Sequence, residues 1–152
     1  MERTVIDLCA LKDAVIGCNP KLARRLADEA LAAGAPPQTL LSEALVPAMA
    51  VVGERFEQGE YFVPDLIVAA RAMKAAIEPL RPLLAASGVQ PAGRVVIGTV
   101  KGDLHDIGKN LVAAMLEGGG FHVVDLGADV PPAAFVRAVE AHGPDIVAMS
   151  AL

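Results

Sequence analysis

RVVIGTV occupies residues 94–100 and runs directly into the segment KGDLHDIG at residues 101–108. The first seven residues are a nearly continuous β-branched run, which is typical of a parallel strand buried on both faces. A helix is expected next, from about Ile107 to Glu117, because the glycines at 118–120 suit a helix C-terminus. The pattern therefore predicts a strand, a glycine-flanked loop and a helix in succession.

The rest of the C-terminal half continues this alternation. Strands are expected at 121–126 and 145–149, separated by a helix that begins at Pro131-Pro132 and ends near Gly143. Alternating strands and helices predict an α/β class with a doubly wound parallel sheet, similar to the flavodoxin-like order 2-1-3-4-5. The expected strands form the contiguous half of that order, so we expect a sheet truncated after its third strand, in a fragment of a longer chain.

Residues 1–87 are expected to be helical. Their apolar residues repeat at helical spacing, and Pro79 and Pro82 are expected to kink or divide the last helix. Helices joined by short links predict an antiparallel four-helix bundle. The predicted organisation is a helical cap domain at 1–87, a linker at 88–93 and an α/β domain at 94–152. The four helices are expected over 5–16, from Asn19-Pro20 to Gly34, over 38–56, and from Val63 onward.

Composition and charge exclude some classes of function. The net charge is −5 and no block of Lys and Arg forms a basic face, so nucleic acid is not expected as a partner. The apolar stretch 44–52 is too short to span a bilayer, and the N-terminus is a poor signal peptide. We expect a cytoplasmic protein without a membrane partner. Cys9 and Cys18 lack a Cys-x-x-Cys spacing and are expected to be small core residues.

The loop after the first α/β strand carries the candidate chemistry. Ligands of open α/β sheets bind beyond the carboxyl ends of the strands. His105 has acidic neighbours in Asp103 and Asp106, and a carboxylate that accepts the far N–H of an imidazole strengthens it as a metal ligand. Gly102 and Gly108 permit close approach of a bulky ligand.

Other interpretations of this loop compete. An isolated Asp-x-His is more often a solvated loop than a functional one. A zinc site needs three or four ligands, and His122 and His142 are not in comparable loops. A receiver-type phosphoacceptor site needs an acidic cluster and a downstream Lys. A dinucleotide site needs Gly-x-Gly-x-x-Gly, which does not open the helix here.

Residues 98–110, GTVKGDLHDIGKN, closely resemble the signature loop of methyltransferase-type cobalamin-binding proteins, whose pattern is Asp-x-His-x-x-Gly, a spacer, Ser-x-Leu and then Gly-Gly. The 41 residues 109–149 separate Gly108 from Ser150-Ala151-Leu152, as in that family. DLGADVP at 125–131 resembles its second loop, and GERFEQGEYFVPDL at 53–66 resembles the helical cap before the cobalamin domain. The chain is also similar to the cobalamin module of methionine synthase.

The resemblance implies a binding site for cobalamin or a related corrinoid, with methylcobalamin as the carried form and cobalt as the metal. His105 would replace the cofactor's own base as the lower cobalt ligand, with Asp103 bonded to its far nitrogen. Met73 and Leu66 are candidate cap contacts, with the bundle core as the alternative. The other implied cofactor-binding residues are Gly102, Leu104, Asp106, Ile107 and Gly108 in the first loop, Gly127 and Val130 in the second, and Ser150 and Leu152 beside the nucleotide tail.

The function implied by the resemblance is that of a methyl carrier, which is not an enzyme on its own. It would work between a substrate:corrinoid methyltransferase and a second methyltransferase acting on coenzyme M or tetrahydrofolate, with a reductive activator as a further partner. A B12-dependent sensor built from the same two domains is the alternative. A carbon-skeleton mutase domain is a third possibility, which the helical cap disfavours.

Overall fold

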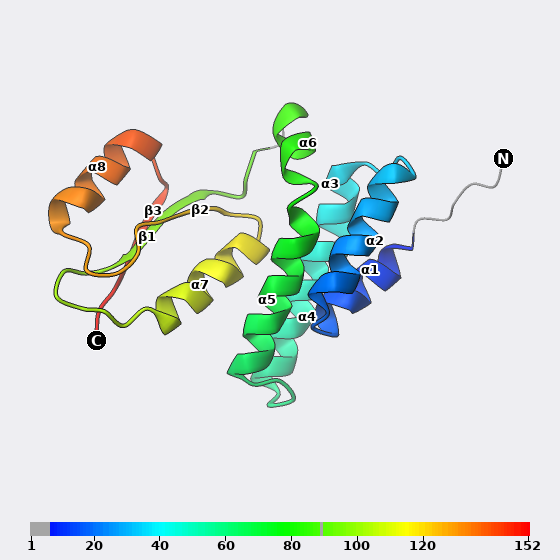
Figure 1. Cartoon of the computed structure of the whole chain (residues 1–152), viewed down its shortest axis with the longest axis horizontal. Helices are drawn as coiled ribbons and strands as arrows, with labels where there is room; N and C mark the ends of the chain where they lie inside the picture. Colours follow the sequence, from blue (N-terminus) through cyan, green and yellow to red (C-terminus); the bar gives the residue numbers. More distant parts are fainter. Residues whose placement is uncertain (1–6, 89) are drawn as a thin grey trace. The chain divides into compact units, whose positions relative to one another are not determined.

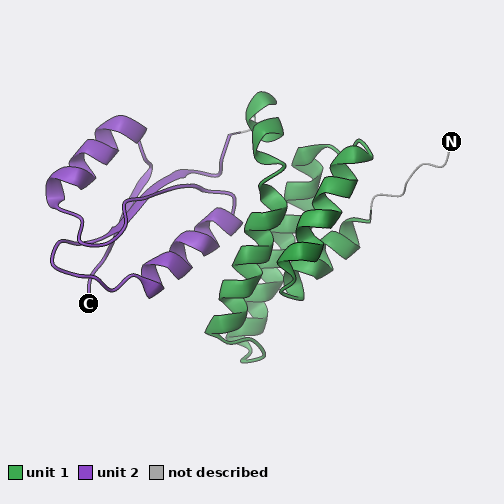
Figure 2. Ribbon diagram, viewed as in Figure 1, with its two compact units in different colours: residues 1–89 green, residues 90–152 purple. Residues whose placement is uncertain are grey.

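The structure, a computed structural model, describes residues 7–88 and 90–152. It divides the chain into two compact units, residues 1–89 and 90–152 (Figure 2). The first expected helix includes Val5 and Ile6, which lie outside the described residues. Among the described residues, no helix combines the length and the hydropathy needed to cross a membrane.

The N-terminal unit is a helical bundle, as predicted. In Figure 1, α5 runs antiparallel to α4, and the contacts place α5 against both α2 and α4. α3, η1 and α4 follow one another without a break and fill the place of the single helix expected at 38–56. The predicted division of the last helix near Pro79 is confirmed, because α5 ends at Ile77 and α6 begins at Arg81. The elements are α1 (Leu8–Ile16), α2 (Pro20–Ala32), α3 (Pro37–Thr39), η1 (Leu40–Leu45, a π-helix), α4 (Val46–Glu57), α5 (Val63–Ile77) and α6 (Arg81–Ala86).

Local sequence explains how these helices begin and where one of them is irregular. The side chain of Asn19 accepts a hydrogen bond of 3.0 Å from the Leu22 N–H, and Pro20 occupies the first helical turn of α2. The π-helix η1 lies just before Pro47, which has no N–H to donate. The Val46 N–H bonds the Leu41 carbonyl five residues back, so the wider turn accommodates the proline without ending the helix.

The expectation that both cysteines are core residues is wrong for Cys9. The α1 face that packs into the bundle carries Leu11, and a residue two positions away on a helix points to the opposite side. Cys9 is therefore exposed, whereas Cys18 is partly buried in the turn after α1, with its Sγ 3.4 Å from the Asp65 carbonyl.

The C-terminal unit is the predicted α/β structure. Within residues 90–152 the sheet has three parallel strands in the order β2-β1-β3, which confirms the expected half of the flavodoxin-like order. Figure 1 shows α7 and α8 on opposite sides of this sheet. The elements are β1 (Arg94–Thr99), α7 (Ile107–Gly118), β2 (His122–Asp125), α8 (Pro132–His142) and β3 (Ile146–Ser150).

The central strand β1 anchors the core of this unit. Val95, Val96 and Ile97 are at most 3% exposed, as expected for a strand covered on both faces. Val96 packs in a cluster with Val130 and Phe135. Because all strands are parallel, their carboxyl ends share one edge, where the loops that follow β1, β2 and β3 meet.

Candidate functional site

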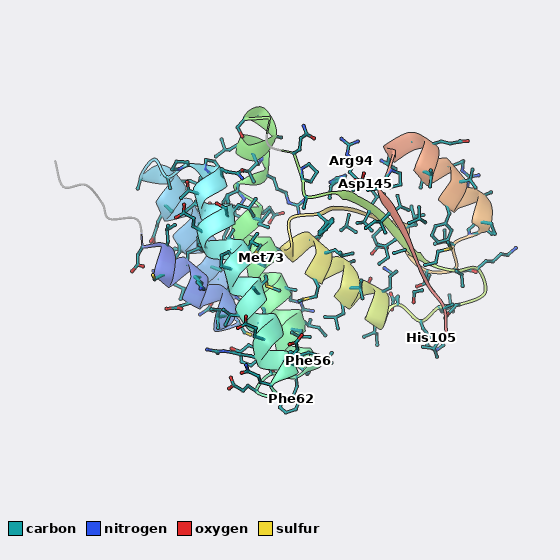
Figure 3. The ribbon with its side chains drawn as sticks, turned by 180° about the vertical axis from the view of Figure 1, so that it is seen from behind. Phe56, Phe62, Met73, Arg94, His105 and Asp145 are labelled. Atoms are coloured by element: carbon teal, nitrogen blue, oxygen red, sulfur yellow. The ribbon has the colours of Figure 1, made fainter. Side chains whose placement is uncertain are left out.

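His105 lies at that carboxyl edge, in the loop between β1 and α7. Figure 3 shows it at this end of the strands, while Arg94 and Asp145 lie at the opposite end. Its side chain is 70% exposed, and its Nδ1 is 2.6 Å from Asp103 Oδ1. An ionised carboxylate can only accept, so Nδ1 carries the proton and donates it. The Nε2 lone pair is then free for a ligand on the open side.

Asp103 is held by three hydrogen bonds. Its Oδ1 accepts the His105 backbone N–H at 2.9 Å as well as the ring N–H, and its Oδ2 accepts the Leu152 N–H at 2.8 Å. These bonds lower the pKa of the Asp103 carboxyl below its ordinary value, the His105 backbone N–H contributing most and the His105 side chain next. The carboxylate that orients the imidazole is therefore kept ionised.

Residues from all three loops converge on Asp103. The Asp129 N–H donates to the Asp103 carbonyl at 3.0 Å, and Asp129 Oδ1 in turn accepts the Gly102 N–H at 2.8 Å. The Val100 N–H bonds the Ser150 carbonyl at 3.0 Å, and Leu152 reaches Asp103 directly. The fold thus joins the first loop, the second loop and the end of β3 into one hydrogen-bonded surface.

Two members of this network were missed by the sequence interpretation. Thr99 is fully buried, and its Oγ1 donates to the His105 carbonyl at 3.0 Å. In sequence it is indistinguishable from the other β-branched residues of the strand. Asp129 adopts a φ of +54°, which is uncommon for a residue other than glycine. Asp129 could have been found from sequence only by its position in the second loop, DLGADVP at residues 125–131.

Two exposed apolar side chains belong to the same segment as His105. Leu104 precedes it directly and Ile107 follows two residues later, and each is 76% exposed. A Cβ placed on Gly102, Gly108 or Gly127 would meet nothing within 4 Å, so these positions face free space. Gly102 and Gly127 both have a φ of +85°, a conformation that only glycine adopts readily.

The remaining predicted site residues have more varied positions. Asp106 immediately precedes α7 and is partly buried, as is Ser150 at the end of β3. Val130 is only 4% exposed, and its side chain packs in the core beneath the second loop. Leu152 is 97% exposed.

The two candidate cap contacts belong to the bundle core. In the helical unit, Met73 is 1% exposed and Leu66 is 6% exposed. Both side chains are buried, which agrees with the bundle-core alternative stated for them from sequence.

The site offers a single exposed nitrogen ligand, which suits a metal ion that is already held by most of its ligands in a cofactor. Among residues 7–88 and 90–152, no group of three His, Cys, Asp or Glu side chains is placed to hold a metal ion. The site instead offers one exposed imidazole with a carboxylate behind it, apolar neighbours and unobstructed glycines. A cobalt ion that brings its own corrin ligands would need one further nitrogen ligand and apolar contact. The residues present fit such a group, because His105 could supply the nitrogen and Leu104 and Ile107 could supply the contact.

Comparison with known proteins identifies the family. Residues 8–81 match one family described as a B12 binding domain, and residues 93–152 match a second family with the same description. Trimethylamine corrinoid protein 1 of Methanosarcina mazei is 46% identical over 143 residues, which are 93% of this chain and 66% of that protein. A corrinoid protein of Desulfitobacterium hafniense is 37% identical over 145 residues, 93% of this chain and 67% of that protein.

Solved structures agree with this assignment. The methanol:cobalamin methyltransferase complex of Methanosarcina barkeri matches with a TM-score of 0.86 and 33% identity, over 95% of this chain and 56% of that chain. A cobalamin-binding protein from Desulfitobacterium hafniense matches with a TM-score of 0.74 and 39% identity, over 97% and 70%. The chain belongs to the family of B12-binding corrinoid proteins. It spans 66% of the length of the trimethylamine corrinoid proteins that it matches.

Proposed function

We propose that this chain is the cap and cobalt-ligating part of a corrinoid methyl carrier, with His105 as the lower ligand of cobalt. The observation that carries the proposal is the His105–Asp103 pair at the carboxyl edge of the sheet, in which the His105 side chain is 70% exposed and its Nε2 is unengaged. The names of the relatives support the carrier role, because they are corrinoid proteins of trimethylamine and dimethylamine systems. A carrier of this kind is a component of a methyltransferase system and not an enzyme by itself.

Each part of the site has a distinct task in this proposal. The corrinoid, when bound, supplies a cobalt centre that accepts and releases a methyl group. His105 would provide a nitrogen ligand to the cobalt, and Asp103 would fix the tautomer of His105 and increase its basicity. Leu104 and Ile107 offer apolar contact, and Gly102, Gly108 and Gly127 let the backbone approach the ring. Asp106 and Val130 would support the two loops, and the nucleotide tail of the cofactor would lie beside Ser150 and Leu152.

The proposed partners follow from the same relatives. The structural match to a methanol:cobalamin methyltransferase complex supports docking of a substrate:corrinoid methyltransferase. A second methyltransferase acting on coenzyme M or tetrahydrofolate, a reductive activator and a cytoplasmic location complete the proposal. The relatives' names favour a carrier over a B12-dependent sensor.

The ligand assignment is tested by replacing His105 with alanine in the full-length protein. After reconstitution with hydroxocobalamin, the wild type should show the absorbance spectrum of a His-ligated corrinoid, and H105A should lose it. His142→Ala is the matched control, because His142 is also exposed but lies at the end of α8. An unchanged spectrum in H105A would exclude His105 as the ligand.

The carrier role needs a separate experiment. Reconstituted, reduced protein is incubated with purified methylamine or methanol methyltransferases and the isotopically labelled donor. Transfer of label to the protein, and from it to coenzyme M or tetrahydrofolate by a second methyltransferase, is the expected result. A protein that binds corrinoid but takes no label from any of these donors would favour the sensor alternative.

A further inference from the structure

A lysine is buried beside the candidate site without contributing to its exposed surface. Lys109 lies in the first turn of α7, and its side chain is 1% exposed. A charge removed from water to this degree requires close partners. Its Nζ donates to Asp125 Oδ1 at 2.8 Å, to Asp125 Oδ2 at 2.6 Å and to Asn110 Oδ1 at 2.6 Å. Three ammonium protons thus have three acceptor atoms.

The carboxylate that pairs with this lysine also holds the second loop. Asp125 is the last residue of β2, and its Oδ1 accepts the Gly127 N–H at 2.8 Å. The Gly127 carbonyl then accepts the Thr99 N–H at 2.9 Å, and Thr99 Oγ1 donates to the His105 carbonyl at 3.0 Å. A continuous series of hydrogen bonds therefore connects the Lys109 ammonium to the backbone of His105.

An ion pair at this position is not needed for stability alone. Well-packed apolar side chains of similar volume commonly stabilise a buried site as well as an ion pair does, because they carry no desolvation cost. The ion pair fixes the orientation of the Asp125 carboxylate. The Lys109 ammonium binds both carboxylate oxygens, so that Oδ1 stays directed toward the Gly127 N–H. Gly127, with its φ of +85°, is the turn at which the second loop leaves the sheet.

We propose that Lys109 is a positioning residue for the corrinoid site, acting through Asp125 and Gly127 to hold the second loop against the His105 loop. The proposal rests on the proposed function, because it takes His105 as the cobalt ligand. The hydrogen bonds of the Lys109 side chain go to Asn110 and Asp125, and its 1% exposure keeps it out of the open surface that carries His105. Its task is to keep both loops in place before the cofactor arrives, so that binding requires little ordering of the loops.

Lys109→Met is the informative variant, because the two ends of the ion pair are exposed unequally. The Asp125 side chain is 39% exposed, so water can solvate it when the lysine is gone. Removing Asp125 instead leaves a buried ammonium without a counter-charge, which endangers folding. Lys101→Met is the matched control: Lys101 lies in the same connection between β1 and α7, but it is exposed. Both variants change the net charge equally.

Two measurements on the full-length protein test the proposal. In the apo protein, the Gly127 amide should exchange faster with solvent in K109M than in the wild type or K101M. With hydroxocobalamin, K109M should bind about 10-fold more weakly, in the range found for residues that support metal ligands, and should show a smaller His-ligated fraction. K101M should match the wild type in both measurements.

The outcomes separate the two proposals. Wild-type affinity, spectrum and Gly127 exchange in K109M would overturn the positioning role, even if the variant is less stable. If K109M does not fold, the double variant K109M/D125N removes both charges and should show the same 10-fold loss; wild-type binding by it would also overturn the role. Failure of the proposed function would appear elsewhere, as an unchanged spectrum in H105A, while the apo exchange measurement would still report on Lys109.

Discussion

Replacing Thr99 with valine removes one hydrogen bond from the backbone of His105 and leaves the shape of the side chain nearly unchanged. Thr99 is fully buried, and its Oγ1 lies 3.0 Å from the His105 carbonyl. A single intramolecular hydrogen bond contributes about 1 kcal/mol to the free energy of unfolding. The acceptor belongs to an exposed residue, so water can replace the lost donor in part. We therefore expect T99V to lower the free energy of unfolding by about 0.5–1 kcal/mol.

Thr99→Ser is the matched control, because it makes the opposite change. It keeps the hydroxyl that donates to His105 and removes a buried methyl group, which costs about 1 kcal/mol. The two variants should therefore be similarly destabilised. They should differ at the site, because T99V alone leaves the His105 backbone without its donor. Loss of about 1 kcal/mol from the positioned ligand corresponds to about 5-fold weaker corrinoid binding.

The assay combines urea unfolding of the apo protein with hydroxocobalamin titration followed by absorbance. T99V should show weaker binding and a smaller His-ligated fraction, whereas T99S should bind as the wild type does. If T99S loses as much affinity as T99V, the loss follows from general destabilisation and the hydrogen bond has no special role. Equal affinities in all three proteins would refute the reasoning entirely.

Two further predictions concern the core beneath the site and its carboxylate. Gly98→Ala should lower the free energy of unfolding by about 1–3 kcal/mol. A Cβ at this position would lie 3.0 Å from Phe135 Cζ and 3.2 Å from Val130 Cγ2, so the core would have to shift. An unchanged urea midpoint would contradict this packing. Asp103→Asn should destabilise the apo protein at neutral pH but less so in acid. The pKa of Asp103 is lowered in the folded protein by its hydrogen bonds from His105 and Leu152. The stabilisation is therefore fully present above the ordinary pKa of an aspartate carboxyl and is lost as the pH falls through the lower pKa of the folded state. Urea midpoints at pH 7 and pH 3 test this prediction, and an equal difference between D103N and wild type at both would count against it.

Local patterns were sufficient for the elements and their order. The β-branched run at 94–100 predicted β1, and the observed strand is Arg94–Thr99. Asn19-Pro20 predicted the start of α2, and the prolines near residue 80 predicted the break between α5 and α6. These features follow from neighbours in the chain, through capping groups, missing N–H donors and side-chain shape. Tertiary packing changes them little.

Local patterns failed where position relative to other elements mattered. Cys9 lies in an apolar segment but on the outer side of α1. For Met73 and Leu66 the pattern left both a cap contact and the bundle core open, and only the fold shows that both side chains are buried. Thr99 could not be distinguished from its β-branched neighbours, because its partner, the His105 carbonyl, is a backbone atom. The residue type of a side chain does not indicate which backbone atoms that side chain will contact in the folded protein.

The residues of the carboxyl-edge loops therefore divide into two groups. The Asp-x-His motif and its spacing to Ser150 were sufficient to nominate His105 and Asp103, because these residues interact over two positions of the chain. The contacts of Lys109 with Asp125 and of Leu152 with Asp103 emerged only from the folded sheet. Leu152 reaches Asp103 across 49 positions, and Lys109 reaches Asp125 across 16. The physical reason is that parallel strands bring loops far apart in sequence to one edge, where hydrogen bonds and buried charge depend on distances that only the complete chain fold sets.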